Sequence, residues 1–220
     1  MKKNKMMRIV SVLLVAVIIT TCAISGTFAK YVTSGSGSDS ARVAKFGVTV
    51  TGTGETFAKT YEAHDGSFTV DTNTVVSTEK VVAPGTSGSM AAFTITGTPE
   101  VAVRVNFTGT LELGDKWVDS ASAYYCPIEI TVGSTTFKGT DYASADEFET
   151  AVNEKIVTYT KDYAAGTNLS TIGANAPAIS WKWAFNGNDD VKDTYLGDQA
   201  AAGNAATISL SVTATVTQID

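Results

Sequence analysis

Strict alternation of apolar and polar residues over 101–113 is the feature that most constrains the fold of this chain. Successive side chains of a β-strand point to opposite faces of its sheet, so a period of two predicts a strand with one buried and one wet face. The apolar members are Val101, Val103, Val105, Phe107, Leu111 and Leu113. The segment 208–217 repeats the pattern with Ile208, Leu210, Val212, Ala214 and Val216. Two long strands of this kind predict an antiparallel, β-rich domain.

Shorter segments between turn signals predict the other strands. Asp-Gly, Pro-Gly and Asn-Gly pairs mark the turns, because these residues adopt turn conformations at low cost. The expected strands cover 43–51, 67–70, 74–82, 90–96, 128–132 and 179–185. Several short strands at this spacing are typical of an all-β sandwich.

One segment, 143–159, breaks the pattern and predicts a helix. Ser144 followed by Glu147 forms a capping box, which marks a helix start. Apolar residues then recur every four positions, at Phe148, Val152 and Ile156. We therefore expect an all-β fold over 43–220: a two-sheet antiparallel sandwich, jelly-roll-like, with a short helical insertion.

The first 29 residues carry an export pattern. The basic residues come first, at Lys2, Lys3, Lys5 and Arg8. An apolar run over 9–19 and a small-residue stretch ending at Ala29 follow, which is typical of a secretory signal peptide cleaved between Ala29 and Lys30. A retained membrane anchor is the alternative, but the run is shorter than the roughly 20 residues that span a bilayer. Lipidation at Cys22 is a minor alternative, because the two threonines before it fit that processing poorly.

Charge and cysteine content narrow the function classes. Removal of 1–29 leaves 191 residues with 12 basic and 22 acidic side chains, a formal charge of −10. This charge favours solubility and argues against nucleic-acid binding. Only Cys126 remains after cleavage, so no internal disulfide can form and packing must stabilise the fold.

Candidate catalytic groups are sparse. The single histidine, His64, lies in a turn pattern, and a zinc peptidase would need further ligands at converging spacing. Cys126 precedes an apolar strand and is interpreted as a core residue rather than as a thiol nucleophile. A cluster of side-chain oxygens gives a weak calcium candidate at Asn186, Asn188, Asp189 and Asp190. It lacks the regular ligand spacing and terminal glutamate of an EF-hand. Because the catalytic candidates are weak throughout, we expect no enzyme activity, and calcium is the one possible cofactor.

The tryptophans divide between core and surface. Trp181 and Trp183 share one face of an expected strand, which predicts that both are buried. Trp117 lies in a polar loop and is the candidate for exposed contact, together with Tyr124 and Tyr142. A monomeric adhesin or carbohydrate-binding β-sandwich is therefore an alternative function.

Three sequence blocks carry a family resemblance. They are 26–32 (GTFAKYV) with 44–48, 82–85 (VAPG) with 92–95 and 101–113, and 179–185 (ISWKWAF) with 210–218. On these blocks the chain resembles the TasA/camelysin-type exported proteins of Gram-positive bacteria, whose signal peptide a SipW-type signal peptidase removes. It departs from the family's better-known member in ending almost at the last strand and in its Ser/Gly-rich linker after the first mature residues.

The resemblance implies a secreted jelly-roll subunit of biofilm-matrix or cell-surface fibres. The mature N-terminal segment, within a flexible region 30–42, would be donated into a groove of the next subunit. The donor strand would comprise Lys30, Tyr31, Val32 and Thr33. The implied partners are further copies of the chain, a related minor matrix protein and the signal peptidase. Some relatives are labelled metalloproteases, but this sequence carries no zinc-binding motif, so a secreted metallopeptidase is a low-ranked alternative.

Overall fold

The computed structural model describes residues 3–26, 42–52, 56–62, 74–90, 93–171, 176–185 and 189–219. The chain separates into two compact units, Met1–Arg42 and Val43–Asp220. The first contains α1 (Lys3–Gly26), and no helix among the described residues is long and apolar enough to cross a membrane. The expected cleavage site Ala29–Lys30, the donor segment Lys30–Thr33, His64 and the expected strand 67–70 lie outside the described residues.

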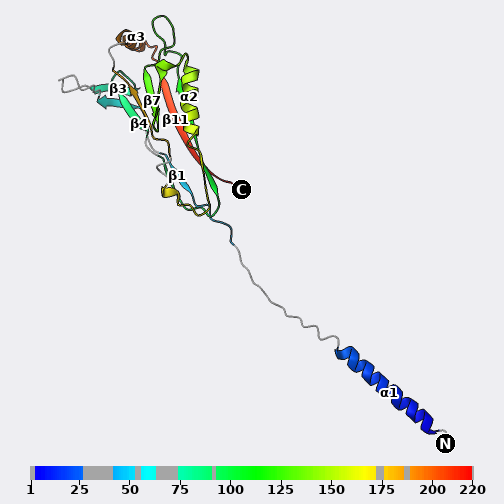
Figure 1. Cartoon of the computed structure of the whole chain (residues 1–220). Coiled ribbons are helices and arrows are strands. Elements are labelled where there is room, and N and C mark those ends of the chain that lie inside the picture. The colour runs from blue at the N-terminus through cyan, green and yellow to red at the C-terminus, as the bar shows by residue number, and fades with distance from the viewer. Residues whose placement is uncertain are drawn as a thin grey trace. The chain divides into compact units, whose positions relative to one another are not determined.

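The described residues of the second unit, which we call the domain, form mostly strands in several antiparallel sheets, with two helices (Figure 1). One sheet has the order β4 (Ser87–Met90), β10 (Ile179–Trp183), β7 (Ile128–Val132) and β8 (Thr135–Lys138). Another has the order β11 (Ile208–Gln218), β6 (Val103–Leu113) and β9 (Lys161–Tyr163). Two-stranded sheets pair β1 (Thr49–Thr51) with β5 (Thr94–Thr96), and β2 (Ala58–Glu62) with β3 (Thr74–Val81). Short 3₁₀ turns occur at η1 (Gly139–Asp141) and η2 (Leu169–Thr171).

The long alternating segments form strands where the sequence predicts them. β6, β7 and β11 match the expected segments to within two residues, and β6 buries the predicted side chains Val103, Val105, Phe107 and Leu111. The expected strand 43–51 is wrong over most of its length, since only Thr49–Thr51 pair. Gly47 there has φ of 44°, which interrupts an extended conformation. The expected strand 90–96 is also wrong as one element, because β4 ends at Met90 and β5 begins at Thr94.

The predicted helical insertion is confirmed as α2 (Ala145–Val157). The Ser144 hydroxyl accepts a hydrogen bond from the Glu147 amide at 3.2 Å, and the Glu147 carboxylate accepts one from the Ala143 amide at 3.1 Å. This reciprocal pair is the predicted capping box. The buried face consists of Phe148, Val152 and Ile156. A Cβ atom at Gly109 of β6 would overlap Ile156, so glycine allows α2 to lie close against this strand.

Aromatic contacts join the core across the domain. The rings of Phe93 and Phe107 lie 5.9 Å apart, and those of Trp117 and Trp183 lie 6.0 Å apart. Trp181 is 2% exposed and Trp183 is 5% exposed, which confirms their prediction as core residues. The core draws on β5, β6, β7, β10 and α2, so residues far apart in sequence fix the positions of the strands.

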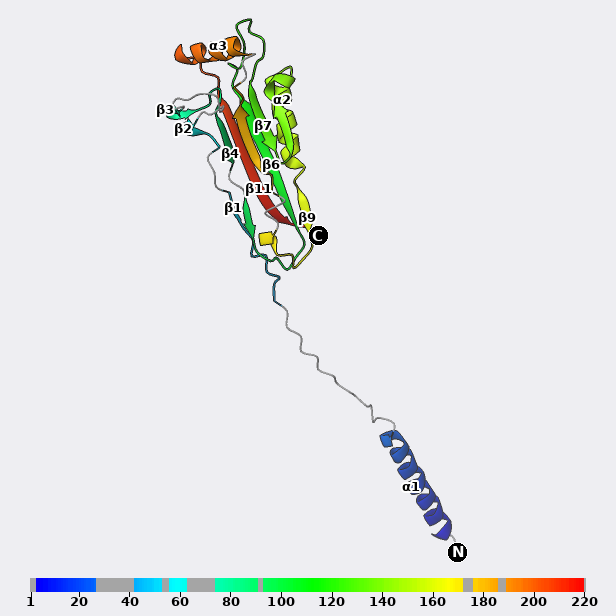
Figure 2. The same ribbon diagram turned by 60° about the vertical axis from the view of Figure 1, so that its left-hand side comes forward.

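A second helix of the domain, α3 (Asp190–Ala201), was not predicted. Leu196 is its one residue classed as buried, so no apolar stripe with a period of 3.6 marks it in the sequence. Both views of the domain place α3 at one end and β1 at the opposite end, where the C-terminus also lies (Figure 2). The expectation of a single helical insertion is therefore wrong.

Candidate functional site

The outer edge of β11 is the feature of the domain most suited to binding another chain. β11 pairs with β6 in an uninterrupted antiparallel register from Ile208 opposite Leu113 to Gln218 opposite Val103. Among the described residues, no strand pairs with its other side. A strand edge of this kind presents backbone N–H and C=O groups that an added strand can satisfy.

The hydrogen bonds of β6 show which residues of β11 face this open edge. The amides of Leu111 and Leu113 donate to side chains of α2, so the odd-numbered residues of β6 point away from β11. Its even-numbered residues therefore bond to β11, and the register places them opposite odd-numbered β11 residues. The backbone groups at the open edge consequently belong to Ile208, Leu210, Val212, Ala214, Val216 and Gln218.

Most of these residues also supply an apolar row. The side chains of Ile208, Leu210, Val212, Ala214 and Val216 pack against the core but are only half-buried. Their neighbours on the opposite face are exposed serines and threonines. An added strand would therefore gain backbone hydrogen bonds and apolar burial from the same residues.

β11 lacks the devices that natural proteins use to protect sheet edges. Charged residues, proline and bulges normally discourage pairing at an edge. The eleven residues of β11 include no charged residue and no proline, and the register contains no bulge. The edge strand β8 carries Lys138, and β9 carries Lys161 and Asp162. The long edge of β11 is therefore unprotected, whereas these two shorter edge strands carry charge.

The other edge of β6 is already occupied. β9 pairs with Val103–Val105, and beyond it side chains from α2 and the residues after it accept from the β6 amides. Thr160 accepts from Phe107 at 3.3 Å, Asn153 accepts from Leu111 at 2.9 Å, and Glu149 accepts from Leu113 at 2.6 Å. These side chains take the place of a neighbouring strand, so within the described ranges the three-stranded sheet lacks a strand partner on the β11 side.

A polar cluster fixes α3 beside the start of β11. The Asp193 carboxylate accepts from the Tyr125 hydroxyl at 2.7 Å and from the Trp183 indole N–H at 3.1 Å. Burial raises the pKa of the Asp193 carboxyl above its ordinary value. The Lys192 ammonium nitrogen lies 3.5 Å from a carboxylate oxygen of Asp119 and 4.8 Å from the centroid of the Tyr125 ring. Polar contacts therefore hold α3 where apolar burial is small.

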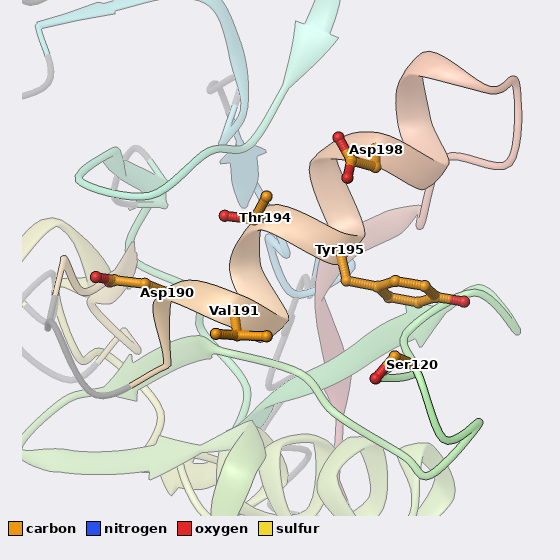
Figure 3. Close-up of a pocket in the computed structure, with 6 residues that line it drawn as sticks. All are labelled: Ser120, Asp190, Val191, Thr194, Tyr195 and Asp198. Carbon is orange, nitrogen blue, oxygen red and sulfur yellow. The ribbon is translucent and has the colours of Figure 1, made fainter.

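The outer side of α3 forms an open hollow with the loop between β6 and β7. It is lined by Ser120 and five α3 residues, Asp190, Val191, Thr194, Tyr195 and Asp198 (Figure 3). Val191 is 81% exposed, and the two aspartates make this surface acidic.

The prediction that Trp117 is exposed is wrong. Its side chain is 2% exposed, and its indole N–H donates to the Thr207 carbonyl at 2.7 Å. The polar loop folds back over the core, where Trp183 covers the ring. The Tyr124 hydroxyl is also buried, and the Tyr142 ring contacts Phe148. The carbohydrate-binding alternative thereby loses its main aromatic contact.

The remaining candidates give no catalytic or metal centre within the described ranges. Asn186 and Asn188 of the calcium candidate lie outside them, Asp189 precedes α3 and Asp190 begins it. The described residues include no group of three or more His, Cys, Asp or Glu that could hold a metal. Cys126 is fully buried as predicted, and burial raises the pKa of its thiol to about 12, so the thiol stays protonated at neutral pH.

Comparison with family models, curated proteins and solved structures finds no match for this chain. The likeness to the TasA/camelysin-type family therefore stays a prediction that rests on the sequence blocks.

Proposed function

We propose that this protein is a secreted structural subunit of extracellular-matrix or cell-surface fibres. The observation that carries the proposal is the unprotected edge of β11, with its half-buried apolar row. The N-terminal segment Lys30–Thr33 of one copy adds to this edge in the next copy as a further strand. The segment satisfies the backbone groups of the part of β11 that it pairs with and covers the apolar side chains there.

The finer fold belongs to the same proposal. We take the sheets that contain β6 and β10 as the two layers of a jelly-roll-like sandwich. The contact between Trp117, in the loop after β6, and Trp183 of β10 supports this arrangement, because aromatic pairs at about 6 Å are typical of a packed interior. In such a fold the strand added beside β11 extends one layer.

Hydrogen bonds of Lys45 mark the start of the domain. Lys45 is fixed to Glu100 twice: its carbonyl accepts from the Glu100 amide at 2.9 Å, and its amide donates to the Glu100 carboxylate at 2.9 Å. The predicted donor Lys30–Thr33 and its tether Ser34–Ser40 therefore precede this anchor, and Phe46 belongs to the domain rather than to the donor.

Donation joins different surfaces on the two copies. The donor segment of one subunit contacts the β11 edge of another, so the contact is heterologous and generates an open filament unless the rotation closes a ring. Processing by a SipW-type signal peptidase would release the segment at Lys30, and a related minor matrix protein with a free edge of the same kind would be a further partner.

Electron microscopy of two purified proteins tests the proposal. One begins at Lys30 and the other at Ala41, so they differ only in the donor and most of its tether. Circular dichroism checks that both fold. We expect fibres from the first protein and monomers from the second. Fibres of equal number and length from both proteins would overturn the proposal.

A further inference from the structure

The direction in which the added strand runs can be inferred from the domain. We propose that the donor segment pairs antiparallel to β11 and enters the acceptor subunit at the end that carries α3. This inference rests on the proposed function and goes beyond it, because a donated strand could run in either direction.

The two ends of the domain are defined by hydrogen bonds. At one end, the Ile219 amide donates to the Ala102 carbonyl at 3.0 Å, next to Glu100, which binds Lys45. The chain therefore enters the domain at the end where β11 finishes, which we call the Lys45 end. At the other end, the Gly114 amide donates to the Thr207 carbonyl at 2.8 Å, so β6 finishes where β11 begins.

α3 lies at the end where β11 begins. The Asp193 contacts to Tyr125 and Trp183 fix the helix there, and the chain passes from Ala201 to Ile208 through six residues. Both views of the domain show α3 and the C-terminus at opposite ends (Figures 1 and 2). We call this the α3 end.

Symmetry distinguishes the two directions. A donor parallel to β11 would enter at the Lys45 end of the acceptor, so the Lys45 ends of two subunits would meet. Each tail could then reach the partner's β11, which gives a reciprocal pair that closes on itself. A donor antiparallel to β11 brings a Lys45 end against an α3 end, and both subunits keep a free surface for growth. The antiparallel direction is therefore the one that leaves both subunits able to grow into an open fibre.

The length of the donor allows this path. Residues 30–40 number 11 and reach roughly 36–40 Å when extended. The eleven residues of β11 span about 36 Å. A four-residue donor that enters at the α3 end can therefore pair with the nearest part of the edge and leave its tether, Ser34–Ser40, to connect the two domains.

Disulfide trapping with full chains expressed and exported by a bacterium tests the direction. Tyr31→Cys and Thr33→Cys proteins are each mixed with proteins that carry one cysteine on the exposed face of β11. The acceptor positions are Ser209, Ser211, Thr213, Thr215 and Thr217. Val32→Cys and Ser34→Cys form a second donor set, in case Tyr31 and Thr33 face the core. Each donor–acceptor mixture is prepared in two backgrounds. One carries Cys126→Ser, and the other retains the buried Cys126 as a control.

The β11 position that forms the strongest disulfide with each donor cysteine gives the direction of the added strand, whatever its register. When the donor cysteine moves from residue 31 to 33, we expect the strongest disulfide to move by two positions towards Ser209. A shift by two positions towards Thr217 would overturn the antiparallel inference and leave the proposed function standing. Fibres without any disulfide to β11 would overturn both the direction and the site. Failure of the parent protein to form fibres would overturn the proposed function itself.

Discussion

Proline at Val212 removes one backbone donor from the middle of the open edge. The Val212 amide faces away from β6, so the substitution leaves the hydrogen bonds between β6 and β11 intact. Proline is tolerated at such edge positions. The matched control is Thr213→Pro, because Thr213 lies opposite Thr108 and its amide faces β6. We expect Thr213→Pro to lower the stability of the monomer more, since the Thr108 carbonyl loses a hydrogen bond worth about 0.5–1.5 kcal/mol.

The expected effect of Val212→Pro on assembly follows from the same geometry. One hydrogen bond to the incoming strand, worth about 0.5–1.5 kcal/mol, is lost, and the ring leaves a carbonyl of that strand without a partner. Each contact between subunits then weakens by about 1–3 kcal/mol. A change of this size raises the critical concentration for fibre formation by about 5- to 150-fold.

Sedimentation of fibres over a concentration series measures the critical concentration, and thermal unfolding measures the stability of the monomer. We expect Val212→Pro to fold and to assemble only at higher concentration. If the Val212→Pro protein folds and its critical concentration equals that of the parent, the edge of β11 is not the acceptor and the reasoning fails.

Three further variants test the contacts that support the edge. Trp117→Ala should lower the free energy of unfolding by about 3–5 kcal/mol in denaturant titrations, because the ring is buried; an exposed Trp117 would give almost no change. Glu149→Ala should cost about 1–3 kcal/mol, because the Leu113 amide loses its acceptor, whereas Glu154→Ala on the exposed face of α2 should be neutral. The raised pKa of Asp193 makes its contribution to stability fully present below the unfolded-state pKa, near 3.9, and lost as pH rises through the folded-state pKa. Asp193→Asn should therefore gain stability relative to the parent as pH rises over this range, and parallel curves would contradict this assignment.

Local pattern predicts the elements that form the candidate site, but not their arrangement. β6 and β11 follow from a period of two, and α2 follows from a capping box and a period of four. Strand order depends on contacts between distant residues, so the sequence does not show that β11 is an edge. The acceptors at Asn153 and Glu149, which close the other edge of β6, come from a helix about 40 residues away along the chain.

The missed features share a physical cause. α3 is held through Asp193, whose partner Tyr125 lies 68 residues away, so no local apolar pattern marks the helix. β9 pairs over three residues and contains Lys161 and Asp162, which gives it no strand pattern. Trp117 is buried because its loop folds over the core, although its neighbours in sequence are polar. The hairpin partner β8 could have been predicted from the pair Gly133-Ser134, which is typical of a two-residue hairpin turn after β7. The φ of 63° at Gly133 is a conformation that favours glycine.

Electron cryo-microscopy of fibres grown from the protein that begins at Lys30 tests the central claim most directly. We expect density for one additional strand beside Ile208–Gln218 of every subunit, continuous with the Lys45 end of its neighbour. A fibre whose β11 edge is bare, or is paired with anything other than the neighbour's N-terminal segment, would contradict the proposed mode of assembly.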